Sequence, residues 1–202
     1  MKIIITLLTA FVISLTSLAD EVSSIYNKDK KLSSEKIDEY IQWVEPYIKQ
    51  YPPRFKSKEQ QKKIYLSSMF IIKEVLKLDY SNISDSQLLA KLGHISAMGH
   101  NLNLQSAPTA KRLFEKSLKI ESEDVKTNYL MGMFLVSTRK HFFESIPYLE
   151  KALKLGHEDA RFTLGLIKVK QGKLNEGLKM LEKYSQKNPE SKHVKKVIQS
   201  IK

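Results

Sequence analysis

The sequence contains no cysteine, and it has only 7 glycines and 6 prolines among 202 residues. The absence of cysteine excludes disulfide bonds, thiolate-held iron–sulfur clusters, cysteine zinc sites and a cysteine nucleophile. Seven glycines are too few for an all-β sandwich that needs a glycine at most of its turns. What remains is a basic chain with a net charge of +12, whose 42% hydrophobic and 28% charged residues are typical of a folded protein.

Patterns that carry catalysis or bind a cofactor are also missing. The phosphate-binding motifs G-x-x-x-x-G-K-[ST] and G-x-G-x-x-G, the nucleophile motif G-x-S-x-G and the zinc motif H-E-x-x-H do not occur, and the five histidines are scattered. The acidic pairs at 123–124 and 158–159 stand where helices are expected to begin, and the helix dipole stabilises acids there. We therefore expect no cofactor, no metal site and no enzymatic activity.

Long hydrophobic runs are confined to the amino end. Residues 3–18 carry no charge, follow Lys2 and end at the small-x-small sequence Ser17-Leu18-Ala19. This arrangement predicts a secretory signal peptide over residues 1–19, cleaved after Ala19, and hence a periplasmic or secreted protein. A retained membrane anchor stays open as an alternative, because the run approaches the length that a spanning helix needs.

The remaining chain has helical periodicity almost throughout. Apolar residues at steps of three and four predict a helix over residues 34–50, which Pro52 and Pro53 end. Over residues 64–78 the apolar residues nearly encircle the helix axis, so a deeply buried helix is expected. Ser57 and Ser84 each begin a capping-box pattern, and Asn188 is expected to cap the last helix. Residues 20–83 should therefore form an N-terminal helical pair.

An internal repeat is the strongest signal in the sequence. A small residue is followed four positions later by a large apolar residue at four places, namely Ser68–Ile72, Ala110–Phe114, Ser145–Leu149 and Gly177–Leu181. Before the last three of these pairs, an expected helix carries Leu92-Gly93, Met131-Gly132 or Leu164-Gly165. We expect the glycine and the small residue to let two helices approach closely, with the large residue filling the space between them.

This pattern resembles the tetratricopeptide repeat, a helix–turn–helix unit of 34 residues. The unit from about residue 157 to residue 189 is most similar, although Arg161 and Lys168 replace the usual Trp and Tyr, and residues 156–165 are also similar to a Sel-like repeat. The resemblance implies an all-α fold, specifically an α-solenoid of three tetratricopeptide-like units with a capping helix over residues 84–202. The N-terminal pair would be a degenerate unit, and stacked neighbours would supply the core that one pair cannot form.

The resemblance also implies a partner-binding groove, because the first helix of each unit in this family lines a concave surface. The positions concerned are Gln87, Lys91, His94 and Met98 in the first unit, Lys126, Tyr129, Met133 and Val136 in the second, and Phe162, Leu166 and Lys170 in the third. Ala90 and His94 do not match the family's clamp for a C-terminal carboxylate. The expected function is a non-catalytic adaptor or scaffold of the bacterial envelope that binds a protein or peptide.

Two other functions stay open. The basic C-terminal segment, whose apolar stripe is Val194, Val197, Ile198 and Ile201, is able to lie on an anionic membrane surface. The second alternative is a small-molecule or glycan site built from the aromatic residues Tyr40, Trp43, Tyr47 and Tyr51. Nucleic acid is not an expected partner, because export argues against it and the sequence has no basic groove interleaved with aromatic residues.

Overall fold

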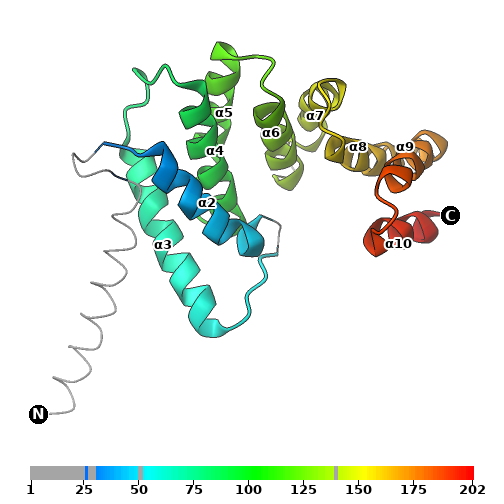
Figure 1. Cartoon of the computed structure of the whole chain (residues 1–202), viewed down its shortest axis with the longest axis horizontal. Helices are drawn as coiled ribbons and strands as arrows, with labels where there is room; N and C mark the ends of the chain where they lie inside the picture. The colour runs from blue at the N-terminus through cyan, green and yellow to red at the C-terminus, as the bar shows by residue number, and fades with distance from the viewer. Residues whose placement is uncertain (1–25, 27–30, 50–51, 139–140) are drawn as a thin grey trace, which may run out of the picture. The chain divides into compact units, whose positions relative to one another are not determined.

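The computed structural model describes residue 26 and residues 31–49, 52–138 and 141–202. The predicted signal peptide, residues 1–19, and Tyr51 lie outside this part of the chain. Within it the fold is all-α, as the sequence predicted: nine α-helices and one short 3-10 helix are connected by turns (Figure 1). The β-structure of the described residues is limited to one isolated bridge between Tyr26 and Leu32.

The chain divides into two compact units, one up to Ser117 and one from Leu118 onward. Unit 1 comprises α2 (Ser34–Ile48), α3 (Lys58–Lys77), α4 (Ser86–Asn101) and most of α5 (Ala107–Ile120). Unit 2 comprises α6 (Val125–Ser137), η2 (Phe142–Glu144), α7 (Ser145–Lys154), α8 (Asp159–Lys170), α9 (Leu174–Lys187) and α10 (Lys192–Ile201). The boundary between these units falls inside α5. The sequence predicted a boundary between residues 83 and 84.

Side-chain caps begin several of the helices. The Ser57 hydroxyl accepts the Gln60 N–H at 3.1 Å, as the capping-box pattern predicted. The next helix is capped by Asp85 and not by Ser84, since the Asp85 carboxylate accepts the Leu88 N–H at 3.0 Å. The last helix begins three residues later than expected, because Ser191 and not Asn188 is its cap.

Three helical hairpins share the close packing that the repeat pattern predicted. A Cβ added to Gly93 on α4 would lie 2.9 Å from the ring of Phe114 on α5. A Cβ on Gly132 of α6 would lie 2.6 Å from Leu149 of α7, and one on Gly165 of α8 would lie 2.9 Å from Leu181 of α9. The small residues that precede these large ones, Ala110, Ser145 and Gly177, are all buried. The three glycines therefore have equivalent surroundings.

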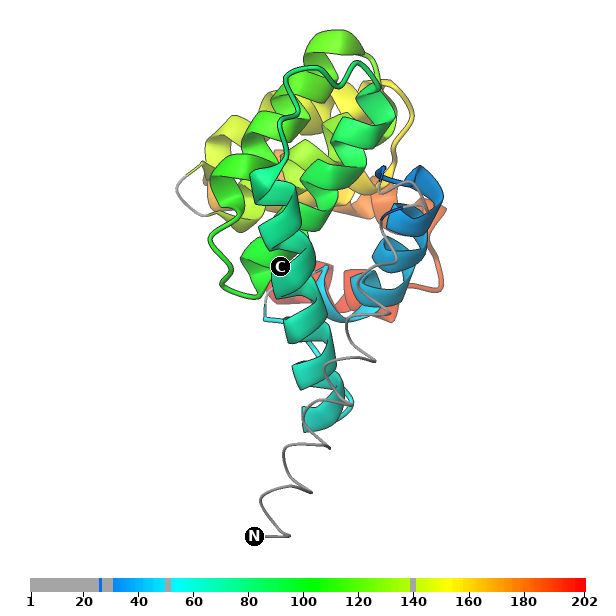
Figure 2. The same cartoon turned by 90° about the vertical axis from the view of Figure 1, so that its left-hand side faces the viewer.

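The core of unit 1 joins α2 and α3 to α4. Ile37, Val44, Ile71 and Leu92 are all buried in this one apolar cluster. A buried hydrogen bond fixes the end of α2, because the Asn101 side-chain amide donates to the Ile48 carbonyl at 2.8 Å. This bond satisfies a carbonyl that the helix end would otherwise leave without a partner. The tip of α3 extends past the other helices of this unit (Figures 1 and 2).

The helix α3 is less buried than the sequence predicted. One side contributes Ile64, Ile71 and Val75 to the core, whereas Met69 and Leu76 are exposed. The expectation of a deeply buried helix is therefore wrong. Apolar periodicity shows how far round the axis apolar residues extend, but it does not show how many neighbouring helices are present to cover them.

The core of unit 2 is a cluster formed by α7 and α8, with Leu149, Ala152, Ala160, Leu164 and Ile167 as its buried members. The last helix, α10, packs against α9 and buries Val194. Across the described residues, no helix combines the length and the apolar character that crossing a bilayer requires.

Candidate functional site

The structure brings the predicted groove residues of α6 together with the beginning of α8. The Tyr129 ring stacks on His157, with ring centroids 3.8 Å apart and an angle of 14° between the planes. One turn along α6, the Met133 sulfur accepts the Thr163 hydroxyl at 3.4 Å. Tyr129, Met133 and Val136 are all half-buried against the α7–α8 cluster. These side chains combine packing with partial exposure.

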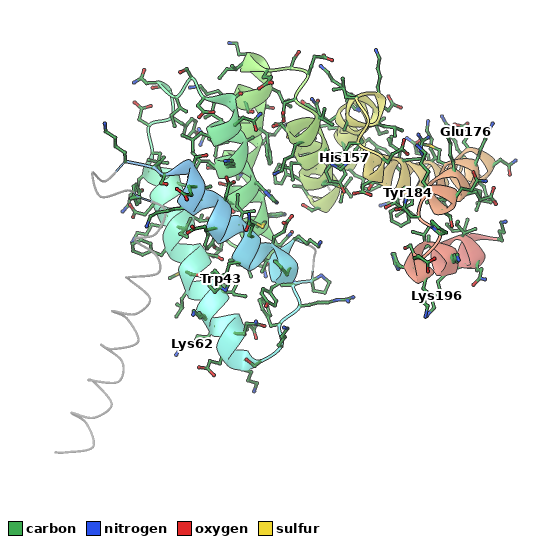
Figure 3. The ribbon with its side chains drawn as sticks, in the orientation of Figure 1. Trp43, Lys62, His157, Glu176, Tyr184 and Lys196 are labelled. Atoms are coloured by element: carbon green, nitrogen blue, oxygen red, sulfur yellow. The ribbon has the colours of Figure 1, made fainter. Side chains whose placement is uncertain are left out.

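Phe162 extends this surface toward the end of the chain. Its ring lies 5.5 Å from that of Tyr184 on α9 and 6.0 Å from that of His193 on α10, measured between centroids. The Tyr184 hydroxyl donates to the Asp159 carboxylate at 2.7 Å. Burial and this bond raise the pKa of Tyr184 to about 12, so the phenol stays protonated and keeps donating at neutral pH. Figure 3 labels Tyr184 and His157 in unit 2.

One lysine lies at the start of α6 and another at the end of α8. Lys126 is exposed in the first turn of α6, and Lys170 is exposed at the end of α8, where its Nζ lies 4.1 Å from the ring centroid of Phe142. That geometry is a cation–π contact. One turn before Lys170, Leu166 is half-buried on α8. We call the following set the α6–α8 surface: Lys126, Tyr129, Met133, Phe162, Leu166 and Lys170.

The predicted groove residues of the first unit have a different environment. Met98 is buried in the core cluster that α2 shares, and His94 is buried too, with its Nε2 3.9 Å from the Glu45 carboxylate of α2. The Lys91 ammonium bonds the Asp38 carboxylate of α2 at 2.6 Å. Helix α2 therefore occupies the face that the sequence analysis assigned to a partner, and of these four residues only Gln87 is exposed.

An ion-pair cluster connects α8 to α9 beside this surface. The Glu158 carboxylate accepts from Arg161 at 2.9 Å and from Lys187 at 2.7 Å. These two hydrogen bonds lower the pKa of Glu158 to about 2. The charge of Glu158 thus links the first turn of α8 to the last turn of α9 at neutral pH.

Sequence reasoning missed His157, Tyr184 and His193 as members of this region. One signal for Tyr184 was present, because the repeat pattern has Ser117 and Ala152 at the equivalent positions. Both of those small residues are buried, whereas the larger Tyr184 packs beside Phe162. A large residue at a position that is otherwise small indicates that its surroundings differ from those in the other units. Here Tyr184 lies beside Phe162, whose ring also lies near His193 of α10.

The aromatic residues considered for a glycan site do not form one surface. Tyr40 is buried and shares a hydrogen bond of 2.7 Å with the Ser68 hydroxyl, and Tyr47 is half-buried against the same core. Burial raises the pKa of Tyr40. Trp43 is the one of these described aromatics that is exposed. Among the described residues, no group of three His, Asp or Glu side chains could hold a metal ion.

Comparison with known proteins adds no family assignment. No family model, curated protein or solved structure matches this chain.

Proposed function

We propose that this protein is a tetratricopeptide-like adaptor that binds a protein or peptide partner through the α6–α8 surface and has no catalytic role. The observation that carries the proposal is the equivalent packing of Gly93, Gly132 and Gly165. Three hairpins with the same internal contact are what an array of repeated units requires. The finer arrangement that we propose is an α-solenoid with α10 as its terminal cover.

The chemistry of the α6–α8 surface suits a binding role. Tyr129, Met133 and Phe162 are large side chains that are already packed on one side, so a partner would gain contact area while losing little rotamer freedom. Methionine adapts its shape to a partner because its side chain is unbranched. Lys126 and Lys170 add positive charge at the two ends. The partner that fits presents apolar side chains flanked by acidic groups.

We further propose that the protein works in the bacterial envelope, on the strength of the N-terminal sequence. Fractionation of the source cells, followed by N-terminal sequencing of the mature protein, tests this proposal. A mature chain beginning at Asp20 supports export, and an uncleaved chain in the membrane fraction supports the retained anchor.

The binding proposal is tested by site-specific photo-cross-linking in the source cells. A photoreactive phenylalanine analogue replaces Met133 in one variant and Leu166 in a second, and the exposed Glu150 of α7 in a control variant. The proposal expects the same cross-linked protein from the first two variants and none from the control. Cross-links that are absent at both surface positions, or equally strong at Glu150, would contradict binding at this surface. Turnover of a substrate by the purified protein would contradict the non-catalytic role.

A further inference from the structure

Exposed apolar side chains concentrate on helices α2 and α3. Of the eight large hydrophobic residues that are exposed in the described part of the chain, five belong to these two helices. Trp43 is 37% exposed, and on α3 the exposed fractions are 41% for Tyr65, 44% for Met69, 45% for Phe70 and 49% for Leu76. Single exposed apolar residues are ordinary on protein surfaces, but several on one helix indicate an interaction surface.

Helical geometry places three of these side chains on one side of α3. Tyr65 and Met69 are four positions apart, and Leu76 lies seven positions beyond Met69, so the three project from the same side. Lys62 and Lys73 fall beside them, between this line and Phe70. The first turns of α3 extend away from the rest of unit 1, in both views (Figures 1 and 2). The exposed fractions of Tyr65, Met69 and Leu76 show that this face is accessible.

The same face is positively charged. The helix carries five lysines, at positions 58, 62, 63, 73 and 77, against two acids, Glu59 and Glu74. Glu74 is already paired with Lys77 at 2.9 Å. The Lys63 ammonium lies 5.5 Å from the centroid of the Trp43 ring, which connects the aromatic residue of α2 to the basic face. Figure 3 labels Trp43 on α2 and Lys62 on α3.

We propose that this face of α3, together with Trp43, docks on an anionic lipid bilayer. Lysine stems pack along apolar side chains while their ammonium groups reach lipid phosphates, and aromatic rings suit the layer between headgroups and acyl chains. Each lysine near an anionic surface adds to binding. The surface belongs to unit 1, so it is independent of the α6–α8 surface.

The charge decides against a second copy of this chain as the occupant. Two α3 faces brought together would place lysines opposite lysines, and like charges repel. An acidic protein partner is the remaining competitor, and the experiment below separates it from lipid.

The test measures co-sedimentation of the predicted mature protein, residues 20–202, with vesicles. One set of vesicles contains phosphatidylcholine alone, and the other contains one-third phosphatidylglycerol. Trp43 is the single tryptophan of the chain, so its fluorescence reports on this surface directly. We expect binding to the anionic vesicles alone, weakening as salt is added, with Trp43 becoming less accessible to acrylamide quenching.

Three double variants locate the binding surface. Lys62→Gln with Lys73→Gln should weaken partitioning, by about fivefold for each lysine lost. Met69→Ser with Leu76→Ser keeps the charge and should also weaken it. Lys195→Gln with Lys196→Gln removes the same charge from exposed positions of α10 and serves as the matched control, which should keep most of the binding. Circular dichroism and the urea unfolding midpoint confirm that each variant is folded.

Several results would overturn the proposal. These are absence of binding to anionic vesicles by the unmodified protein, equal binding to neutral vesicles, or unchanged quenching of Trp43 in the bound state. A larger loss in the α10 variant than in the α3 variants would assign membrane attachment to the C-terminal helix. If an acidic amphipathic peptide protects Trp43 from quenching and vesicles do not, α3 is a site for an acidic protein.

Discussion

At the scale of single residues, Gly93 in the α4–α5 hairpin and Gly177 in the α8–α9 hairpin differ in the kind of atom that crowds them. A Cβ on Gly177 would lie 2.7 Å from the Gly165 carbonyl oxygen and 2.9 Å from the Val169 nitrogen, and both atoms are backbone. At Gly93 the nearest atoms, at 2.9 and 3.0 Å, belong to the ring of Phe114. A side chain can shift by a few tenths of an ångström, whereas a backbone atom moves only if the helix moves.

We therefore predict that Gly177→Ala is more destabilising than Gly93→Ala. Overpacking costs about 1–3 kcal/mol, and alanine recovers up to about 1 kcal/mol through its higher helix propensity. The free energy of unfolding should fall by about 2 kcal/mol for Gly177→Ala and by less than about 1 kcal/mol for Gly93→Ala. Urea denaturation followed by circular dichroism measures both changes. Equal losses in the two variants would show that α8 and α9 do not approach as closely as described.

At the scale of helices, α2 explains why part of the predicted groove is closed. Its apolar residues Val44 and Ile48 belong to the same buried cluster as Met98. Its acidic residue Asp38 accepts a hydrogen bond from the Lys91 ammonium. The contacts of α2 thus replace those that a partner would have made in the first unit. Helix α2 therefore covers the face of α4 on which Met98 and Lys91 lie.

One buried amide at the end of α2 gives the second prediction. Asn101→Ala leaves the Ile48 carbonyl buried without this donor, so the free energy of unfolding should fall by about 1–3 kcal/mol. Hydrogen exchange should accelerate in α2 in particular. Lys91→Met is the control, because the ion pair that it removes is partly exposed and contributes less than about 1 kcal/mol. A larger loss for Lys91→Met would reverse this ranking of the two contacts.

The third prediction concerns acid stability and the link between α8 and α9. The pKa of Glu158 is about 2 in the folded chain, below its value of 4.5 in an unfolded one. The folded state therefore binds a proton at this carboxylate only at a lower pH than the unfolded state does. The stabilisation is present above pH 4.5 and is lost as pH falls toward 2. Glu158→Gln should therefore reduce stability at neutral pH and flatten the decline between these limits.

Thermal unfolding measured across that pH range tests this effect. The control variant is Glu150→Gln, which removes an exposed acid of α7. The control should follow the unmodified protein at every pH. If Glu158→Gln also follows it, the ion-pair cluster does not hold the two helices in solution.

At the scale of the whole molecule, an array of hairpins needs a cover at its end. We propose that α10 is this cover: it packs against α9 with Val194 buried and Val197, Ile198 and Ile201 half-buried, while its lysines remain exposed. A terminal helix with one apolar and one polar face is what the repeat proposal requires.

Deletion of residues 192–202 is the fourth prediction. Burial of a valine or isoleucine side chain stabilises by about 1.5–3 kcal/mol, so the loss of this helix should lower the free energy of unfolding by about 3 kcal/mol or more. Solubility should also fall, because Phe162 loses its contact with His193. The Lys195→Gln, Lys196→Gln variant changes the charge without removing the apolar stripe, and it should retain the stability of the full chain. A deletion that costs less than about 1 kcal/mol would contradict a covering role.

Much of the local structure followed from sequence patterns. Steps of three and four predicted the helices, because a helix repeats its faces over short distances. The repeat pattern predicted that the helix with Gly132 approaches the helix with Leu149 closely. The positions of Tyr129, Met133 and Phe162 on α6 and α8 followed from the same repeat.

Long-range packing settled the rest. Periodicity shows that a helix has an apolar face, but which segment covers that face depends on residues far away in the chain. Met98 was assigned to a partner and is covered by α2, whereas Met69 was expected in the core and is exposed. Tyr184 belongs to the aromatic region around Phe162 because α9 packs against α8 and places the two rings side by side. Helix formation is a matter of neighbouring residues, and burial is decided only when separate helices meet.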